Sequence, residues 1–275
     1  MSASSSFGRE IRLRRLFRHG DQHLFVVPLD HSVTDGPITG TRELDRLVRL
    51  LDRAGVDAVV LHKGSARRLG ARLFSRLSLV VHLSASTRHA PDPDRKYLVS
   101  TVEEALRMGA DAVSVHVNLG SATEHTQLAD LGRVGDACDH WNIPLLAMMY
   151  PRGPGMGDLV QTDVVAHAAT IAADLGADLV KLPYPGSPAG LADVVRSCPI
   201  PVLVAGGPPL GAGTEVARLT EDVIAAGAAG IAMGRNVFQS ADPAGLAKEL
   251  STVVHPADWE PAVASRSGHP LEVRA

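Results

Sequence analysis

Short apolar runs alternate with longer stretches of helical periodicity along most of the chain. Apolar runs of this kind, bounded by turn residues, are typical of strands buried on both faces. The pattern predicts strands at 24–29, 57–61, 79–83, 111–116, 144–149, 178–182, 201–204 and 230–233. Between them, apolar residues that recur on one face predict helices at 41–54, 101–108, 121–141, 162–175 and 214–226.

The same four-residue boundary recurs where three predicted helices run into the next strand. It reads Ala-Gly-Val-Asp at 54–57, Met-Gly-Ala-Asp at 108–111 and Leu-Gly-Ala-Asp at 175–178. Glycine ends a helix well because it adopts the left-handed conformation without the steric cost of a Cβ atom. The repeat therefore supports a regular alternation of strand and helix.

Eight strand–helix units with nearly continuous apolar strands predict a parallel sheet covered by helices, and eight units close naturally into a (β/α)8 TIM barrel. An open doubly wound sheet is the alternative, but the chain lacks an early glycine-rich dinucleotide fingerprint. Because no linker or change in composition divides the chain, we expect 1–275 to form one α/β domain. The barrel should occupy about 20–252, with the tails at 1–20 and about 255–275 as appendages.

Composition narrows the class of protein further. A hydrophobic content of 45% in 275 residues suffices for a large core. The net charge of -3 and the lack of basic tracts argue against nucleic acid or anionic membrane as partners. Cys138 and Cys198 have no metal-ligand spacing around them. With no signal peptide and no apolar run long enough to span a bilayer, we expect a cytoplasmic protein.

Lys181 is the most informative polar residue, because it lies in an apolar run that predicts a buried strand. The interior disfavours an ammonium group, so a lysine there is costly. The cost makes chemical sense if a neutral amine must attack a carbonyl and form a Schiff base. A lysine that extends to the surface is the alternative. Lysine is rare in this chain, which contains only Lys63, Lys96, Lys181 and Lys248.

Polar residues also follow other predicted strands, at the end of the barrel where active sites of this fold lie. Asp30 precedes His31, a pairing that suits proton transfer, although a carboxylate that caps the loop would look the same. Tyr150 could exchange a proton or simply pack with its hydroxyl bonded. Arg152 could bind an anionic group of a substrate.

Two glycine-containing loops follow the last two predicted strands. Gly206-Gly207 would let backbone N–H groups approach an anion, and Gly234-Arg235 opens the next helix. Glycine pairs also serve ordinary turns, but loops at these two positions form the recurrent phosphate site of TIM barrels. The sequence therefore predicts a phosphate site there.

Lys63 follows the second predicted strand and is the competing lysine, either as the nucleophile or as a cation that keeps a Schiff-base lysine neutral. After the fourth strand, His116, Asn118, Ser121 and His125 are candidates for substrate contacts or for loop hydrogen bonds. The 12 histidines are scattered without a ligand pattern, so the sequence indicates no metal site.

Six motifs, in this order, resemble the DeoC/FbaB-type class I aldolases, and the resemblance covers about residues 20–250. They are Pro-Leu-Asp-His-Ser-Val-Thr-Asp-Gly-Pro at 28–37, Leu-His-Lys-Gly at 61–64, Met-Tyr-Pro-Arg-Gly at 149–153, Val-Lys-Leu-Pro-Tyr at 180–184, Ala-Gly-Gly-Pro at 205–208 and Met-Gly-Arg-Asn-Val-Phe-Gln at 233–239. The first motif is most similar to that of members which make amino-C7 keto sugar acids.

The resemblance implies that Lys181 forms the Schiff base, that Tyr150 donates a proton and that Asp30 accepts one, without a metal or other cofactor. It also implies a phosphorylated ketose donor, with dihydroxyacetone phosphate expected, and L-aspartate 4-semialdehyde as the aldehyde acceptor. The product would be an amino-C7 keto sugar-acid phosphate of aminohydroxybenzoate or dehydroquinate-type biosynthesis. The residues expected to contact substrate or phosphate are His31, Ser32, Val33, Thr34, Lys63, Pro151, Arg152, Gly206, Gly207, Gly234 and Arg235.

Family members form large rings, so the resemblance also implies a homo-oligomer such as a decamer. Within the family, a transaldolase-type heptulosonate synthase, a fructose-bisphosphate aldolase and a thiolase-like enzyme are the alternatives. A sugar-phosphate sensor without catalysis is a further hypothesis, but a pure binder needs none of Asp30, Tyr150 and Lys181. A metal-dependent class II aldolase would require the ligand pattern that the histidines lack.

Overall fold

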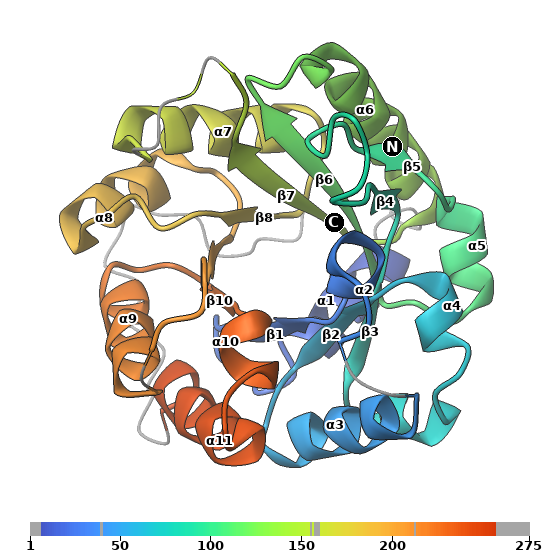
Figure 1. Cartoon of the computed structure of the whole chain (residues 1–275), viewed down its shortest axis with the longest axis vertical. Coiled ribbons are helices and arrows are strands. Elements are labelled where there is room, and N and C mark those ends of the chain that lie inside the picture. Colours follow the sequence, from blue (N-terminus) through green and yellow to red (C-terminus); the bar gives the residue numbers. More distant parts are fainter. Residues whose placement is uncertain (1–6, 39–40, 155, 157–159, 212, 257–275) are drawn as a thin grey trace.

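A computed structural model describes residues 7–38, 41–154, 156, 160–211 and 213–256. Its parallel strands form a closed barrel in the order β1-β10-β9-β8-β7-β6-β3-β2, with helices around the outside (Figure 1). The predicted TIM barrel is therefore confirmed. The barrel strands are β1 (Leu24–Pro28), β2 (Ala58–Leu61), β3 (Ser78–His82), β6 (Ala112–Leu119), β7 (Leu145–Pro151), β8 (Leu179–Leu182), β9 (Val202–Ala205) and β10 (Gly230–Ala232).

The helices between the strands confirm the helical periodicity of the sequence. The predicted ones are α3 (Thr41–Arg53), α5 (Val102–Arg107), α6 (Glu124–Trp141), α7 (Thr162–Asp174) and α9 (Gly213–Ala225). The structure adds α8 (Pro188–Ser197) and α11 (Pro243–Val254), each with proline in its first turn. Their N-caps are Ser187 and Asp242, whose side chains accept a backbone N–H and satisfy a helix start.

Short elements follow several strands and shape the upper end of the barrel. They are the helices α2 (His31–Asp35), α4 (Lys63–Ala66) and α10 (Arg235–Phe238) and the strands β4 (Ser84–Ala85) and β5 (Tyr97–Leu98). The 3-10 helix η1 (Ala71–Ser75) instead comes just before β3. Strands β4 and β5 pair antiparallel in a hairpin that follows β3 and was not predicted. In Figure 1, α2 and α10 lie in front of the barrel.

Alternate residues of each barrel strand enter two separate cores. Phe25 and Val27 of β1, for example, pack outward against the helices. The residues between them face the barrel axis, as the two-residue period of a strand requires. The inward core consists of Leu16, Leu24, Val26, Ala58, Val60, Val80, Ala112, Leu146, Met148, Leu179, Leu203 and Ala232. This alternation determines which side chains reach the site.

The aspartates of the recurrent boundary begin three of the strands and bind neighbouring backbone. Each carboxylate accepts the N–H of a residue at the start of the adjacent strand, which fixes the register there. The bonds run from Phe25 to Asp57 (2.7 Å), from Leu79 to Asp111 (2.9 Å) and from Leu145 to Asp178 (2.8 Å). The sequence analysis explained the glycine of this repeat but not its aspartate.

The N-terminal segment is part of the barrel, and the expectation that 1–20 is an appendage is wrong for the described residues of that range. Helix α1 (Phe7–Leu16) closes the lower end, where Leu16 joins the inward core. Two arginines of α1, and Arg18 just after it, pair with the same three aspartates, contacts that are too distant in sequence for a local pattern to reveal. The ion pairs are Arg9–Asp178 (3.1 Å), Arg15–Asp111 (3.0 Å) and Arg18–Asp57 (3.1 Å).

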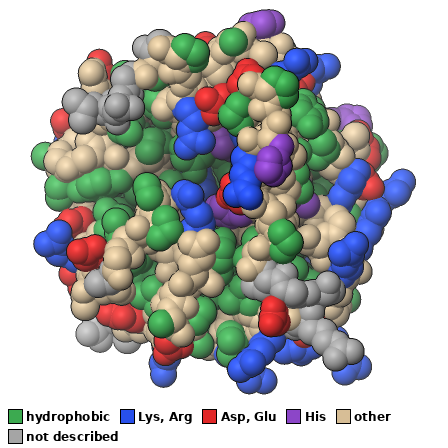
Figure 2. Space-filling view, viewed as in Figure 1, with side chains coloured by type: hydrophobic (Ala, Val, Ile, Leu, Met, Phe, Trp, Pro, Cys, Tyr) green, Lys and Arg blue, Asp and Glu red, His purple; other side chains and the backbone are tan. Residues whose placement is uncertain are grey.

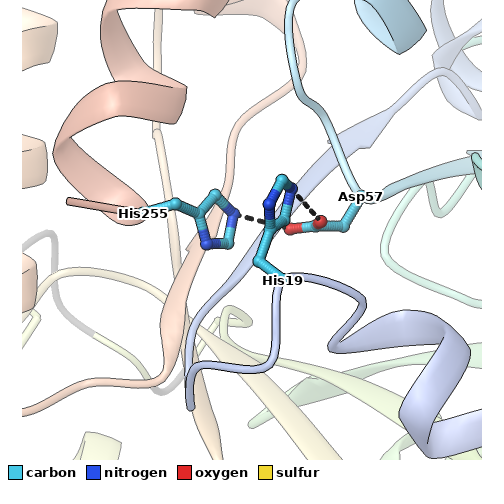
Figure 3. A group of neighbouring side chains, drawn as sticks. All are labelled: His19, Asp57 and His255. Atoms are coloured by element: carbon cyan, nitrogen blue, oxygen red, sulfur yellow. Dashed lines mark hydrogen bonds and ion pairs between the residues drawn. The ribbon is translucent and has the colours of Figure 1, made fainter. Parts of the chain in front are cut away.

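His255, just after α11, also belongs to this closure and not to a loose tail. Its Nε2 lies 2.9 Å from Asp57 Oδ2, its Nδ1 lies 2.7 Å from Asp21 Oδ2, and its ring stacks on His19 (Figure 3). Both ends of the described chain thus meet at Asp57. The rest of the predicted C-terminal tail, 257–275, lies outside the described residues.

Two expectations from composition concern the thiols and membrane helices. Cys138 and Cys198 are both free, and Cys138 is buried. In the described part of the chain, no helix combines the length and apolar character needed to cross a membrane.

Candidate active site

The uppermost inward position of most barrel strands is polar. Every second residue of a strand faces the barrel axis, so steps of two from Val26, Val60, Val80 and Leu179 lead to the inward positions above the apolar core. At these positions the side chains are groups that can exchange protons or form covalent bonds. They are Asp30, His62, His82, His116, Tyr150 and Lys181.

Lys181 follows Leu179 on the inward face of β8, and only 6% of it is exposed. Its Nζ lies 5.8 Å from the centroid of the Tyr150 ring. Among the described residues it has no hydrogen-bond or ion-pair partner. A buried amine without a counter-ion is costly for structure alone, so this lysine is a strong candidate for chemistry.

Asp30 lies beyond the end of β1 with a carboxylate that is mostly buried. Its Oδ2 lies 3.7 Å from His82 Nε2, and its Oδ1 has no hydrogen-bond partner. Burial alone would raise the pKa of Asp30, but the nearby histidines, His82 foremost, and Lys181 hold that pKa well below its usual value. The carboxylate is thus ionised at neutral pH, with an oxygen available to accept a proton.

The histidines around Asp30 are neutral at pH 7. Burial lowers the pKa of His82 to about 4, and the pKa values of His62 and His116 are also lowered, chiefly by burial. His82 Nδ1 lies 2.8 Å from Ser114 Oγ, which orients its ring. These rings therefore supply hydrogen bonds rather than positive charge.

Tyr150 lies between a neutral ring and a cation. His116 stacks on it with ring centroids 4.9 Å apart, and the guanidinium of Arg152 lies 5.6 Å from its centroid. His116 Nε2 in turn lies 2.8 Å from Asn118 Oδ1. Since β7 extends to Pro151 and β6 to Leu119, Asn118 and Tyr150 are strand residues, although the predicted strands end earlier, at 116 and 149.

Two cavities meet at Lys181. The first, here the glycine-loop cavity, is also bounded by Gly206, Gly207 and Gly234. The second, here the histidine cavity, is bounded by Asp30, Thr34, Asp35, His62, His82, Ser84, Ala85, Ser86, Lys96, His116 and Met148. Both are lined by His31, Tyr150, Arg152, Lys181 and Arg235. Figure 2 shows Lys, Arg and His side chains gathered around the middle of this face.

The glycine loops are built for close approach of the backbone. Gly207 has a positive φ of 67°, and a Cβ at Gly234 would lie 2.5 Å from the Pro28 carbonyl oxygen. Among the described residues, the amides of Gly206, Gly207 and Gly234 have no acceptor. Asn236, which the sequence analysis did not select, fixes the first loop by donating to Gly206 O at 2.8 Å. Unpaired amides and Arg235 together suit an anion.

The structure does not bring every predicted residue to the site. Lys63 is the first residue of α4, its Nζ pairs with Glu104 of α5 at 2.9 Å, and it lines neither cavity. Ser32 and Val33 line neither cavity, whereas His31, Thr34, Pro151 and Arg152 do.

Of the four candidates after the fourth strand, only one lines either cavity. His116 lines the histidine cavity, but His125 is exposed on α6. Asn118 and Ser121 are buried and bind Gln127. Sequence reasoning missed the ring residues His62 and His82, which the alternation within strands could have found.

A group with the composition of a metal site lies at the opposite end of the barrel. The ligand atoms of His19, Asp57 and His255 are within 4.8 Å of one another (Figure 3). The Asp57 carboxylate also accepts from Arg18 Nε and the Phe25 N–H, so its acceptor positions are occupied. An adjacent guanidinium disfavours a metal cation, and we assign this group to closure of the barrel.

Comparison with known proteins agrees with this geometry. A closed barrel whose mouth holds a buried lysine, a tyrosine and an ionised carboxylate is the arrangement of a Schiff-base aldolase. The family model described as DeoC/LacD family aldolase matches residues 24–240. The chain belongs to this family and is an enzyme of the class I aldolase type.

Two relatives match nearly their whole length. The chain is 55% identical over 255 residues to 2-amino-4,5-dihydroxy-6-oxo-7-(phosphonooxy)heptanoate synthase of Streptomyces griseus, covering 93% of each protein. It is 46% identical over 248 residues to 2-amino-3,7-dideoxy-D-threo-hept-6-ulosonate synthase 1 of Archaeoglobus fulgidus, covering 90% of this chain and 91% of the relative.

Solved structures support the same chemistry. An archaeal fructose 1,6-bisphosphate aldolase superposes with a TM-score of 0.82 at 31% identity, covering 90% of this chain and 99% of the other. A structure of an archaeal aldolase whose catalytic lysine is covalently bound to the carbinolamine intermediate has a TM-score of 0.81 at 30% identity, with the same coverage. The second of these neighbours binds its substrate covalently through a lysine.

Proposed function

We propose that Lys181 is the Schiff-base lysine of an aldolase that joins dihydroxyacetone phosphate to L-aspartate 4-semialdehyde. The observation that carries the proposal is the position of Lys181, buried and unpaired where the two cavities meet. A donor ketone in one cavity and an acceptor aldehyde in the other would both reach its amine. No step in this scheme requires a metal.

The product expected from the 55% identical relative explains the choice of substrates. In a 4,5-dihydroxy-6-oxo-7-(phosphonooxy) chain, an aldol reaction forms the bond between C4 and C5. Cleavage of that bond yields a three-carbon ketone phosphate and a four-carbon amino-acid aldehyde. These are dihydroxyacetone phosphate and aspartate 4-semialdehyde.

The steps follow from imine chemistry. The Lys181 amine adds to the donor ketone, and loss of water gives an iminium ion that withdraws electrons from the neighbouring carbon. Removal of a proton from the donor's hydroxymethyl carbon gives an enamine, whose carbon bonds to the acceptor aldehyde while the aldehyde oxygen takes a proton. Water then hydrolyses the iminium ion and releases the product and the lysine.

Asp30 and Tyr150 would move the protons in this scheme. Asp30 is ionised and has an unpaired oxygen, which suits the proton acceptor. Tyr150 lies beside Lys181 and supplies a hydroxyl as the proton donor. The unpaired amides of the glycine loops and Arg235 would hold the donor phosphate.

Borohydride trapping tests the proposal directly. Incubation with dihydroxyacetone phosphate and borohydride should label Lys181, and the Lys181→Ala variant should neither be labelled nor turn over substrate. Lys248→Ala, which changes an exposed lysine of α11, is the matched control. If Lys181→Ala is still trapped and still active, the mechanism is wrong. NMR analysis of the product formed with aspartate semialdehyde then identifies the reaction.

A transaldolase reaction is the second candidate, because the chain is also 46% identical to a 2-amino-3,7-dideoxy-D-threo-hept-6-ulosonate synthase. Its donor would be a deoxy-ketohexose phosphate, and the acceptor site would be unchanged. Fructose-bisphosphate aldolase activity is the third, from the structural neighbours. Failure of dihydroxyacetone phosphate with success of the deoxy-ketohexose phosphate would favour the transaldolase.

The proposal extends to a single aldolase domain that works in the cytoplasm as a homo-oligomer, such as a decamer, in aromatic or antibiotic biosynthesis. Support for this part comes from the family resemblance. Light scattering coupled to size-exclusion chromatography measures the oligomer directly.

A further inference from the structure

Lys96 is a second buried lysine near the proposed nucleophile. It lies just before β5 in the hairpin after β3, only 8% of it is exposed, and it lines the histidine cavity. Its Nζ donates to Ser86 Oγ at 2.5 Å and to Pro93 O at 3.2 Å. An ammonium has three donors, so one is left for a group in the cavity.

The charge of Lys96 has no close counter-ion. Among the described residues no carboxylate lies within 4.0 Å of its Nζ, although Asp30, Asp35 and Asp94 lie farther off. Burial lowers the pKa of Lys96, and the nearby Arg152 lowers it further. Partners that are all neutral compensate poorly for the desolvation of an ammonium.

Arg152 is a second cation beside the same cavity. Its guanidinium lies over the Tyr150 ring and forms no ion pair with a described residue. Asp30 and Asp35 line the same cavity, but among the described residues neither carboxylate lies within 4.0 Å of Lys96 Nζ or of the Arg152 guanidinium. An anion from solution or substrate would pair with the two cations directly and relieve their mutual repulsion. This side of the cavity therefore suits an anionic group.

The hairpin that holds Lys96 is fixed in place rather than loose. Asn118 Nδ2 and Gln127 Nε2 donate to Asp94 O at 2.8 and 3.0 Å. On the other side, Thr34 Oγ1 donates to Ser86 O at 3.1 Å. Bonds to β6, α6 and α2 thus position the lysine in advance of binding, which lowers the entropic cost of recognition.

Lys96 and the glycine loops line different cavities, which share Arg152 and Lys181. Lys96, His62 and His82 line only the histidine cavity, whereas Gly206 and Gly207 line only the glycine-loop cavity. Two anionic groups can thus bind in two cavities that both reach Lys181. In an aldol reaction the donor occupies one side and the acceptor approaches from the other.

We propose that Lys96 and Arg152 bind the carboxylate of the acceptor aldehyde and so select a carboxylated acceptor. The inference rests on the proposed function, since it takes the glycine-loop cavity as the site of the donor phosphate. Arg152 offers a planar fork that matches a carboxylate, and Lys96 adds a buried charge.

Acceptor kinetics of Lys96→Met test the inference. With dihydroxyacetone phosphate as donor, KM for aspartate semialdehyde and for succinic semialdehyde should rise about 10- to 100-fold, the loss expected for a hydrogen bond to a charged group. KM for butanal, which lacks the carboxylate, should change less than about twofold. Borohydride trapping with the donor alone should be unchanged. Lys248→Met is the control for loss of a lysine.

Arg152→Gln provides a second variant, because Arg152 is exposed and its replacement leaves the folded core intact. In this variant too, KM should rise for the two carboxylated aldehydes and hardly change for butanal. Two results would overturn the inference. One is an equal rise in KM for all three aldehydes in both variants. The other is loss of donor trapping in Lys96→Met while its thermal unfolding is unchanged.

The two proposals fail in different ways. If the wild-type enzyme condenses aspartate semialdehyde but the variants do not discriminate between acceptors, only the Lys96 subsite is wrong. If the wild-type enzyme rejects every carboxylated aldehyde and accepts glyceraldehyde 3-phosphate, the proposed function is wrong and so is the carboxylate subsite.

Discussion

Lys181 Nζ lies 5.8 Å from the centroid of the Tyr150 ring, across the seam between β8 and β7. Met148 pairs with Lys181 in the ladder, so Tyr150 occupies the next inward position along β7. The Lys181 amine thus lies over the face of the tyrosine ring. This arrangement suits a proton donor to groups attached to the lysine.

Tyr150→Phe should separate imine formation from turnover. The variant keeps the ring and its stacking on His116 but loses the hydroxyl. We expect trapping of the donor by borohydride to persist, while kcat falls about 10²- to 10⁴-fold, the usual contribution of a general acid. Tyr97→Phe, which changes an exposed tyrosine of β5, is the control. Undiminished kcat in Tyr150→Phe would remove the tyrosine from the mechanism.

Arg235→Gln should weaken recognition of phosphate. Arg235 Nη2 donates to Gly207 O at 3.0 Å, so its charge lies beside the unpaired amides of the glycine loops. KM for dihydroxyacetone phosphate should rise about 10- to 100-fold. KM for unphosphorylated dihydroxyacetone should hardly change. Arg196→Gln on the exposed face of α8 is the control, and an equal effect on both donors would place the phosphate elsewhere.

The candidate residues were selected from the ends of the predicted strands and from the family resemblance, not from the alternation within strands. In the structure, Lys181, Tyr150 and Asp30 are each reached by steps of two from an apolar inward residue, and the same count reaches His82, two residues after Val80. His82 was missed because it lies within a predicted strand, at 79–83, and the alternation there was not used.

The errors arise from long-range contacts that local patterns do not contain. Lys63 follows β2 as expected, but its position is decided by Glu104, 41 residues later. Lys96 lies in a hairpin whose strands are two residues each, too short to give a period. Helix α1 has few buried residues of its own, and its arginines find their partners at the starts of distant strands.

Asp57→Asn should destabilise the whole protein. The Asp57 carboxylate is fully buried and joins Arg18, His19, His255 and the Phe25 N–H. Loss of its charge leaves the Arg18 guanidinium with Asp52 alone (3.8 Å) and the His255 imidazole with Asp21 alone (2.7 Å), and it removes the central acceptor of the group. We therefore expect the free energy of unfolding to fall by about 3–5 kcal/mol. Urea unfolding measures this change.

The control for that experiment is Asp45→Asn, which breaks an exposed pair with Arg49 on α3 and should cost less than about 1 kcal/mol. Because Asp57 is at the end of the barrel remote from Lys181, kcat of the folded Asp57→Asn protein should match the wild type. Equal stability of the two variants would show that the closure contributes little.

Deprotonation of His255 should lower the stability of the folded protein as the pH rises above 6.5. Burial alone would lower the pKa of His255, but its hydrogen bonds to Asp57 and Asp21 and their charges raise that pKa above the ordinary 6.5. The folded state therefore holds the proton more tightly than the unfolded state. The resulting stabilisation is complete below pH 6.5 and is lost as pH rises through the folded pKa.

Urea unfolding of wild type and His255→Gln between pH 6 and pH 9 checks this sign. The difference in stability between them should shrink as pH rises, by about 1.4 kcal/mol for each pH unit between the unfolded and folded pKa values. The site histidines have lowered pKa values, so any stability change from their protonation occurs below pH 6.5 and is the same in wild type and His255→Gln. His125→Gln, on the exposed face of α6, should parallel wild type throughout. A constant difference across this range would mean that His255 is neutral between its two carboxylates, and that it is joined to Asp21 and Asp57 by hydrogen bonds without an ion pair.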